Sequence, residues 1–528
     1  MAILNFFALK QRGFKARKLE GICLSKEMVI GLTIAVYVAF MLLIGLLNNR
    51  RSKSMEDFTV GGRNAGAWMS AFSYGTAYFS AVMFIGYAGG TGWKYGLWGI
   101  LPGIGNAVFG ALLAWLVLAR RTRETTRRLE IKSMPQFFHK RFGSGVMKQF
   151  CVAVIFIFLL PYSASVYKGL TSVCSVLLGM DETICMVIIA VVAALVVILG
   201  GYVATLKADF VQGLVMLVGI VALIISVVRC KQVGGFSEGL KAIAAKTGDL
   251  HLGVQDHIGL WATVLMTSFG TWGLPQMIHK YYGVRDDREV RRGTYASAFF
   301  ALIIAGGGYF IGSLSHLFFN SLDEVGTSDY LVPQMLNTAG LSNILLGVVL
   351  VLLIAASVST LASVTITASS TLTMDCVQPK LLPSWGSRKT ALLTKGVCGA
   401  FVALSYVIAN ADTPILDMMS YSWGVLSGSF LAPYVLSLYW KGLNRFGAWC
   451  GMLGGFAAAL PPVLAKLFFP EAMLGGIDKL CNLGPHFACG AMALSFLLCW
   501  AGSLIARAAS LKSAAPNPDF YPAEPAAE

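Results

Sequence analysis

The stretch from Leu352 to Asp375 carries the residues whose types and spacing most clearly suggest chemistry. It reads LLIAASVSTLASVTITASSTLTMD, which is apolar enough to lie in a bilayer, yet hydroxyl side chains interrupt it at Ser359, Thr360, Ser363, Thr367 and Thr371. The spacing i, i+1, i+4, i+8, i+12 places these hydroxyls on one face of a helix, together with Ala356. That face is polar but carries no formal charge.

Two interpretations of this polar face are open. A hydroxyl in hydrocarbon can bond to the carbonyl one turn back, so the stripe could be an ordinary contact between packed helices. Alternatively, uncharged oxygen ligands suit Na⁺, a hard cation, if a second segment contributes backbone carbonyls. The second interpretation requires another helix whose backbone is open at the same depth.

The composition fixes the class of protein in which such a helix lies. Of the 528 residues, 56% are hydrophobic and only 13% are charged, and the mean hydropathy is +0.70. Apolar runs near 20 residues recur throughout, which excludes a soluble globular protein and predicts an all-α polytopic membrane protein with about thirteen transmembrane helices. The predicted spans are 29–47, 68–90, 95–118, 146–178, 184–203, 209–228, 260–282, 294–319, 344–374, 390–408, 415–440, 447–469 and 486–505.

The formal net charge of +15 could suggest a nucleic-acid partner, but its distribution indicates a lipid bilayer instead. Lys and Arg concentrate in alternate loops, which the positive-inside rule places in the cytoplasm. The rule predicts a plasma-membrane protein, with the bacterial inner membrane favoured, whose N-terminus is outside and whose C-terminus is cytoplasmic. The basic N-terminal tail, 1–28, opposes this orientation, and the Ala/Pro-rich tail, 506–528, is predicted to be disordered.

Two predicted spans are interrupted in a way that supplies the open backbone. The span 68–90 contains serines, a threonine and glycines at mid-depth, and the span 260–282 contains Gly270, Gly273 and Pro275. The second stands five spans after the first, so two repeats of five helices, 68–228 and 260–440, would have opposite orientations. One helix, 29–47, precedes them and two, within 447–505, follow.

Candidate solute contacts lie on these interrupted helices and on two others. We expect a pocket between Tyr78 on one broken helix and Trp272, Pro275 and Gln276 on the other, closed by Tyr421 or Trp423. Such a pocket favours an amino acid or a small carboxylate over a bulky sugar.

The fourth span carries Tyr162 and Lys168 well inside an apolar run. An intramembrane lysine usually has a function or a partner, so Lys168 could attract a solute carboxylate, although a lysine can also snorkel to the surface. Asp209, at the start of the sixth span, could be an interfacial helix cap.

Several motifs in combination carry a family resemblance. They are EDFTVGGR, KADFVQG, SVSTLAS, and MSYSWGVLSGSFLAP followed by NRFGAWCGM. Together they resemble the sodium:solute symporter family, nearest its sodium/proline branch, over about Val29 to Ile505. The family implies a LeuT-type fold of five plus five inverted helices, which agrees with the organisation obtained from the spans.

The resemblance also implies residue roles. The sodium site would use the side chains of Ser359 and Thr360 and backbone carbonyls at or near Ala356, Thr76 and Phe79. Asp209 would match the aspartate of the family's ion exit path. Where the proline branch has an aspartate and an aromatic pair, this chain has Tyr78 and the threonines Thr267 and Thr271, which disfavours proline as the solute.

The leading functional hypothesis is therefore symport of a small organic solute with Na⁺ by alternating access. An uncoupled channel or a membrane sensor on the same scaffold is the alternative from another class. An enzyme is disfavoured, because the spans contain no His, Cys and carboxylate cluster at metal-ligand or catalytic-triad spacing.

Overall fold

The described part of the chain is almost entirely helical. The computed structural model describes residues 26–49, 63–248, 250, 252–411, 413–468, 483–510 and 520–521. Within these ranges, the only β-type pairing is one isolated parallel bridge between Ala65 and Val284. The predicted basic tail lies almost wholly outside the described residues.

The helices follow in chain order, with η denoting 3₁₀ or π turns. The first part contains α2 (Lys26–Asn49), α4 (Ala67–Tyr78), η2 (Val82–Tyr87), α5 (Ala88–Tyr95), η3 (Gly96–Ile100), α6 (Leu101–Gly105), η4 (Asn106–Leu113), η5 (Trp115–Ala119), α7 (Arg120–Arg128), α8 (Met134–Phe142), α9 (Gly145–Leu178), α10 (Glu182–Val228) and α11 (Phe236–Thr247). The second part contains α12 (Val254–Phe269), η6 (Gly270–Gly273), α13 (Pro275–Tyr282), α14 (Asp287–Ala301), η7 (Leu302–Gly306), α15 (Gly307–Ser313), η8 (Leu314–Leu317), η9 (Leu322–Glu324), η10 (Ser328–Tyr330), α16 (Leu331–Thr338), α17 (Asn343–Leu372), η11 (Thr373–Val377), α18 (Gln378–Leu381), α19 (Ser387–Ala409), α20 (Ile415–Tyr439), α21 (Arg445–Ala459), α22 (Pro461–Phe468) and α24 (Gly484–Ala508).

Helices long and apolar enough to cross a membrane occur throughout the described ranges. Seven qualify individually, and the bent pair α21 and α22, with an angle of 42°, makes an eighth. The multi-pass prediction is therefore supported, and the count of about thirteen stays a prediction. One local difference concerns 184–203 and 209–228, because a single helical element of 47 residues, α10, covers both predicted spans.

Both predicted helix interruptions are present. The α4 helix ends at Tyr78, and Phe79 is extended with φ −104° and ψ 117° before the chain turns helical again. In the second case α12 gives way to the 3₁₀ turn η6, and Leu274 is extended with φ −78° and ψ 121° before Pro275 opens α13. The first residues of a helix have N–H groups without a partner inside the helix, and proline lacks this N–H. Pro275 therefore favours the start of a new helix at this position.

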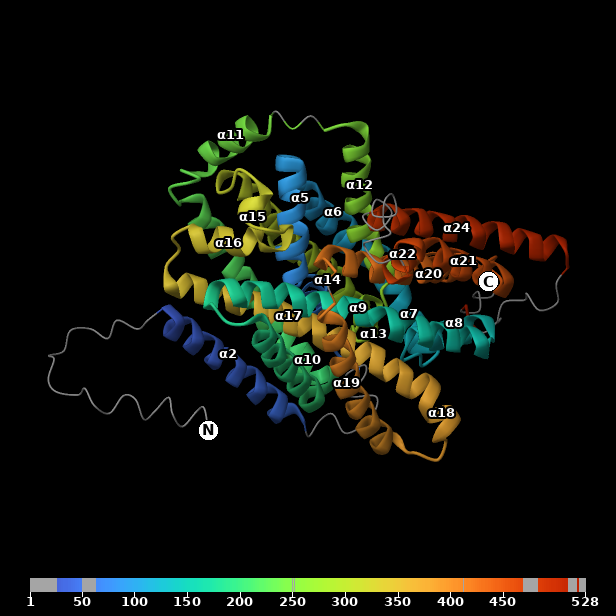
Figure 1. The fold of residues 1–528 in the computed structure, drawn as a ribbon. Coiled ribbons are helices and arrows are strands. Elements are labelled where there is room, and N and C mark those ends of the chain that lie inside the picture. The colour runs from blue at the N-terminus through green and yellow to red at the C-terminus, as the bar shows by residue number, and fades with distance from the viewer. Residues whose placement is uncertain are drawn as a thin grey trace.

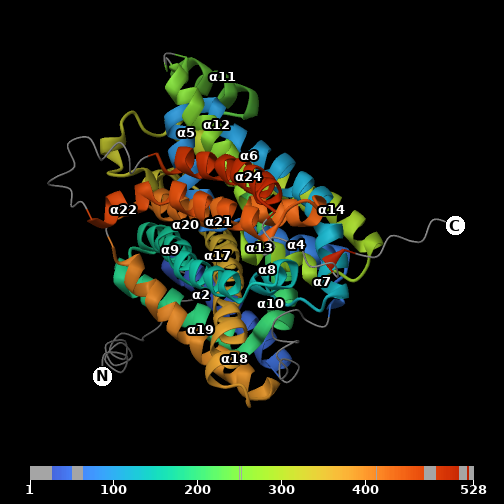
Figure 2. The same cartoon turned by 90° about the vertical axis from the view of Figure 1, so that its right-hand side faces the viewer.

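The helix α17 occupies the middle of the molecule, beside α9 and α10 (Figures 1 and 2). It is buried from Val349 to Thr371, whereas α19 and α24 expose large apolar side chains such as Val407 and Leu497. Exposed apolar side chains on outer helices suit contact with lipid. The hydroxyl stripe is therefore an interior feature.

Parts of the tail that the sequence predicts to be disordered, 506–528, are ordered: α24 continues to Ala508, and two later residues contact other helices. Phe520 is 1% exposed and packs against Phe137 of α8, while the hydroxyl of Tyr521 donates to the carbonyl of Ser437 in α20 at 2.7 Å. The buried guanidinium of Arg141 lies over both rings. The described end of the tail is thus docked on α8 and α20.

Candidate functional site

The hydroxyls of α17 face the break after α4. Thr360 Oγ1 lies 3.1 Å from the carbonyl oxygen of Thr76 and 3.1 Å from that of Ala356. Its neighbour Ser359 places Oγ 2.9 Å from Thr76 Oγ1. The helix break explains the approach, because the carbonyls of Thr76 and Ala77 near the end of α4 are freed from regular helical pairing.

A buried carboxylate stands next to these oxygens. Asp209 of α10 is fully buried, and its Oδ1 accepts a hydrogen bond from Ser359 Oγ at 2.6 Å. The other carboxylate oxygen, Oδ2, accepts a short hydrogen bond from the Ser73 hydroxyl of α4. Asp209 therefore lies in the middle of helix α10 against the hydroxyl stripe, which excludes the interpretation of an interfacial helix cap.

A lysine that the sequence analysis did not select completes this cluster. Lys280 of α13 is 3% exposed, and its Nζ lies 3.2 Å from Asp209 Oδ2. The ammonium also donates to Ser73 Oγ and Ser363 Oγ, both at 2.8 Å. Removing one partner of such a buried ion pair destabilises a protein by about 3–5 kcal/mol. The sequence does contain an indication of this role, because Lys280 is a charged residue inside a predicted span, about one turn after Pro275.

We call Ser73, Thr76, Asp209, Lys280, Ser359, Thr360 and Ser363 the hydroxyl–carboxylate cluster. Between α17 and α4 it offers neutral oxygens, which are the hard ligands that Na⁺ takes, from Ala356, Ser359 and Thr360 of α17 and from Thr76 of α4. The donor set fits a sodium ion bound as a transported substrate. Phe79, the fifth predicted ligand, has an extended backbone and lies at the same helix break.

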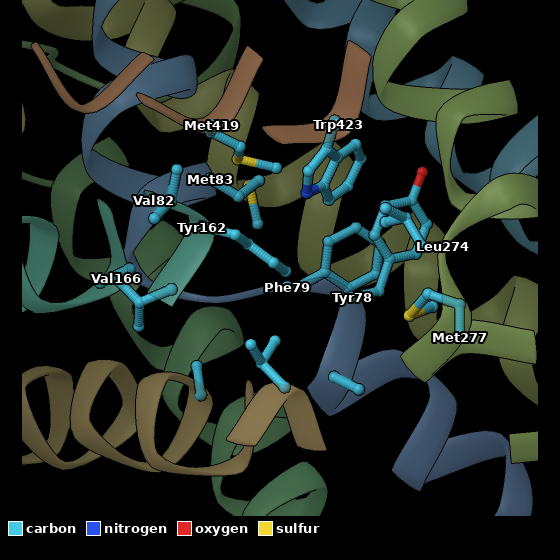
Figure 3. Close-up of a cluster of buried hydrophobic side chains, with 14 of the residues drawn as sticks. Tyr78, Phe79, Val82, Met83, Tyr162, Val166, Leu274, Met277, Met419 and Trp423 are labelled. Carbon is cyan, nitrogen blue, oxygen red and sulfur yellow. The ribbon is translucent and has the colours of Figure 1, made fainter. Parts of the chain in front are cut away.

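An aromatic cluster lies at the same break. Tyr78 stacks on Phe79 with ring centroids 4.2 Å apart, and the ring of Trp423 from α20 lies 6.2 Å from that of Tyr78. Tyr162 of α9 meets Trp423 edge-on at 5.7 Å. Figure 3 shows these rings together with Met83 and Met419. We use the name aromatic chamber for this group of packed, buried side chains.

The polar atoms of the aromatic chamber differ in whether they have a hydrogen-bond partner. The Tyr78 hydroxyl donates to the carbonyl of Thr267 in α12 at 2.6 Å, and so ties the first broken helix to the second. The Tyr162 hydroxyl and the Trp423 indole nitrogen are buried without a hydrogen-bond partner among the described residues. Unpartnered buried donors are costly in a closed protein, so a ligand or a water molecule that accepted a hydrogen bond from them would be stabilised there.

The other predicted solute contacts are not brought to this chamber. Trp272 points its indole nitrogen to the carbonyl of Phe109 at 3.0 Å. Gln276 lines a small cavity beside Lys280, and Pro275 begins α13. Tyr421 lies on the part of α20 near Gly484 of α24.

Lys168 also lies elsewhere. Its Nζ donates to the carbonyls of Ala411 and Thr413, at 2.7 and 2.9 Å, in the segment before α20. The sequence suggests that Lys168 attracts a solute carboxylate, whereas in the structure its side chain extends from within α9 to the segment that joins α19 and α20. This position agrees with the alternative of a snorkelling lysine.

The two broken helices are joined at the arginine-rich end of the molecule. Ala65 N donates to the carbonyl of Gly283 at 2.9 Å, and Arg285 N donates to the carbonyl of Ala65 at 3.0 Å. Arg63 and Arg127 add bonds from their side chains to backbone carbonyls around this bridge. We call the backbone pairing of Ala65 with Gly283 and Arg285 the backbone latch.

Known proteins match this chain over most of its length. The high-affinity proline transporter PutP of Bacillus subtilis (strain 168) is 26% identical over 466 residues, which cover 87% of this chain and 95% of that protein. The osmoregulated proline transporter OpuE of the same organism is 24% identical and covers 83% and 89%. A sodium/proline symporter of Staphylococcus aureus is 25% identical and covers 86% and 89%.

Solved structures show the same fold at low sequence identity. A Na⁺-coupled sialic acid symporter in a substrate-bound, outward-open state aligns with a TM-score of 0.71 at 18% identity, over 91% of this chain and 98% of the other. The nucleobase-cation-symport-1 family transporter MHP1, in a closed conformation, aligns with a TM-score of 0.52 at 14% identity, over 87% and 96%. The predicted all-α fold of LeuT type is confirmed.

A model of the family described as "SSF: Sodium:solute symporter family" matches residues 58–455, which is more than half of the chain. This match includes both broken helices, α17 with its hydroxyl stripe, and Asp209. The chain therefore belongs to the sodium:solute symporter family.

Proposed function

We propose that this protein binds Na⁺ between α4 and α17 and couples the movement of that ion to uptake of a small organic solute. The observation that carries the proposal is the meeting of Thr360 Oγ1 with the Thr76 and Ala356 carbonyls, beside the buried Asp209. Oxygens from two helices hold a cation only while those helices stay together. Bound Na⁺ would therefore stabilise one arrangement of α4 against α17.

The aromatic chamber is the proposed solute site. It lies directly after the break in α4, on the residues next to Thr76, so that sodium and solute would share one stretch of open backbone. It consists of packed apolar rings, and among the described residues the Tyr162 hydroxyl and the Trp423 indole nitrogen have no hydrogen-bond partner. Such a site suits a small amino acid or carboxylate, whose charged groups would bond to the open backbone. The proline transport of the relatives is consistent with this class.

The proposed topology has two inverted five-helix repeats, 68–228 and 260–440, within the plasma membrane. The arginine-rich end with the backbone latch would face the cytoplasm, with the C-terminus on the same side and the N-terminus outside. The distribution of Lys and Arg supports this orientation. The positive charge would meet lipid headgroups and not nucleic acid.

Transport into proteoliposomes tests the proposal. Purified protein is reconstituted, and uptake of radiolabelled amino acids and small carboxylates is measured with an inward Na⁺ gradient, an inward K⁺ gradient or a pH gradient. We expect the Na⁺ gradient alone to stimulate uptake, and unlabelled hexoses not to compete. Uptake that is indifferent to Na⁺ would instead support an uncoupled channel, and selective competition by hexoses would overturn the solute class.

A further inference from the structure

We propose that the ammonium of Lys280 permanently fills a second cation position beside the sodium site, so that this transporter moves one Na⁺ with each solute. The inference deepens the proposed function and rests on it.

The surroundings of Lys280 Nζ are those of a bound cation. Three oxygens accept its three N–H donors: Asp209 Oδ2 at 3.2 Å, Ser73 Oγ at 2.8 Å and Ser363 Oγ at 2.8 Å. They come from three helices, α10, α4 and α17. One carboxylate and two hydroxyls on separate elements form an oxygen cage of the kind that holds a free hard cation.

The cage shares its carboxylate with the proposed sodium site. Asp209 Oδ2 faces Lys280, while Asp209 Oδ1 accepts from Ser359, whose hydroxyl is a proposed sodium ligand. The single negative charge is therefore balanced by a positive charge that belongs to the protein. If Lys280 were absent, the same carboxylate and hydroxyls would be left buried without a counter-charge, and the site would take up a proton or a second cation.

Space for such an ion exists next to the lysine. A cavity of about 10 Å³, which is the smallest size that holds one water molecule, is lined by residues that include Thr205, Gln276, Lys280 and Thr367. Both polar atoms of the Gln276 side chain, which is 1% exposed, have no hydrogen-bond partner among the described residues. Truncation of Lys280 would join this cavity to the oxygen cage.

The test counts sodium ions in the wild type and in Lys280→Ala. Binding of ²²Na⁺ to purified protein gives the number of sites, and the Na⁺ dependence of solute uptake gives a Hill coefficient. We expect one site and a coefficient near 1 in the wild type, and two sites with a coefficient approaching 2 in Lys280→Ala. The binding measurement also works for a variant that no longer transports.

Three further variants give the comparison its controls. Lys280→Arg keeps a tethered charge and should keep one site, whereas Lys280→Ala combined with Ser363→Ala loses an oxygen of the cage and should bind the second ion at least about tenfold more weakly. Lys168→Ala removes a lysine that is held by the Ala411 and Thr413 carbonyls and should leave the sodium count at one.

The outcomes separate this inference from the proposed function. Two sodium sites in the wild type, or one unchanged site in folded Lys280→Ala, would overturn the tethered cation and leave sodium coupling intact. No sodium binding in the wild type would overturn the proposed function itself. Folding of each variant is checked by its melting profile in detergent before ions are counted.

Discussion

The hydroxyl–carboxylate cluster and the aromatic chamber lie at the same helix break, and they differ in how far the protein satisfies its own polar atoms. In the cluster, both carboxylate oxygens of Asp209 and all three donors of Lys280 have partners within the protein. In the chamber, the Tyr162 hydroxyl and the Trp423 nitrogen are buried without a hydrogen-bond partner among the described residues. The first region is preorganised, and the second has unused bonding capacity.

This difference indicates how each region would recognise its ligand. A preorganised set of short oxygen contacts discriminates by ion size and loses function when one ligand is removed. An apolar chamber with a few free donors accepts related solutes and loses affinity gradually, because each lost hydrogen bond is worth about 0.5–1.5 kcal/mol. Variants in the two regions should therefore fail in different ways.

The largest expected effect is in the cluster. Replacing Ser359 and Thr360 together with Ala should abolish sodium-stimulated uptake, because two ligand oxygens are lost and Asp209 loses a donor. Uptake is measured in proteoliposomes against Na⁺ concentration. The matched control is Thr365→Ala on the same helix, whose buried hydroxyl has no hydrogen-bond partner among the described residues. Wild-type sodium dependence in the double variant would disprove the proposed site.

A smaller effect is expected where the two regions meet. Tyr78→Phe removes the hydrogen bond to the Thr267 carbonyl, which joins the two broken helices within the chamber. Leaving that carbonyl unpaired should cost about 1–1.5 kcal/mol, which is a loss of roughly tenfold in solute affinity, with little change in sodium affinity. Solute competition and ²²Na⁺ binding, measured on the same preparation, separate the two affinities. A loss of sodium affinity without a loss of solute affinity would show that Tyr78 belongs to the sodium site and not to the solute site.

Substituting a chamber residue whose donor has no partner among the described residues should affect stability and solute affinity in opposite ways. Tyr162→Phe removes a buried hydroxyl without a partner among the described residues, so the melting temperature without solute should stay the same or rise slightly. Solute affinity should nevertheless fall about threefold to tenfold if the hydroxyl bonds to the solute. The two quantities are read from melting profiles with and without solute. A destabilised protein with unchanged solute affinity would mean that the hydroxyl is structural.

The smallest effect is expected at Lys168. Its ammonium holds the Ala411 and Thr413 carbonyls and lies outside both regions, so Lys168→Met should change the solute affinity by less than about threefold. Uptake kinetics at saturating Na⁺ measure it. A selective loss of solute affinity of about tenfold or more would restore the hypothesis drawn from the sequence, in which Lys168 attracts a solute carboxylate.

Much of the scaffold could be predicted from the sequence because its signals are local. Glycines, small hydroxyl residues and a proline inside apolar runs indicate the two helix breaks, and the period of the hydroxyls in α17 indicates one polar face. Both features depend only on neighbours in the chain. The family motifs then select the LeuT-type fold.

The site was predictable only in part because it depends on side chains that meet across the fold. Lys280 lies near the end of the predicted span 260–282, and nothing in its sequence neighbourhood indicates that its side chain reaches Asp209 of a distant helix. Trp272 and Gln276 share the second break with Thr267, but they point to Phe109 and to the cavity beside Lys280. A break predicts where a pocket can form, and rotamers and helix rotation decide which residues line it.

The backbone latch has a consequence for how gating at this end can be studied. Its two bonds join main-chain atoms, from Ala65 to Gly283 and from Arg285 to Ala65, so alanine scanning would leave both bonds in place and report the latch as neutral. Amide exchange at positions 65 and 285 would detect its opening directly, and a proline at position 285 would delete one donor. A neutral result from alanine scanning would therefore leave open whether this latch controls when the two broken helices separate, and the exchange measurement decides it.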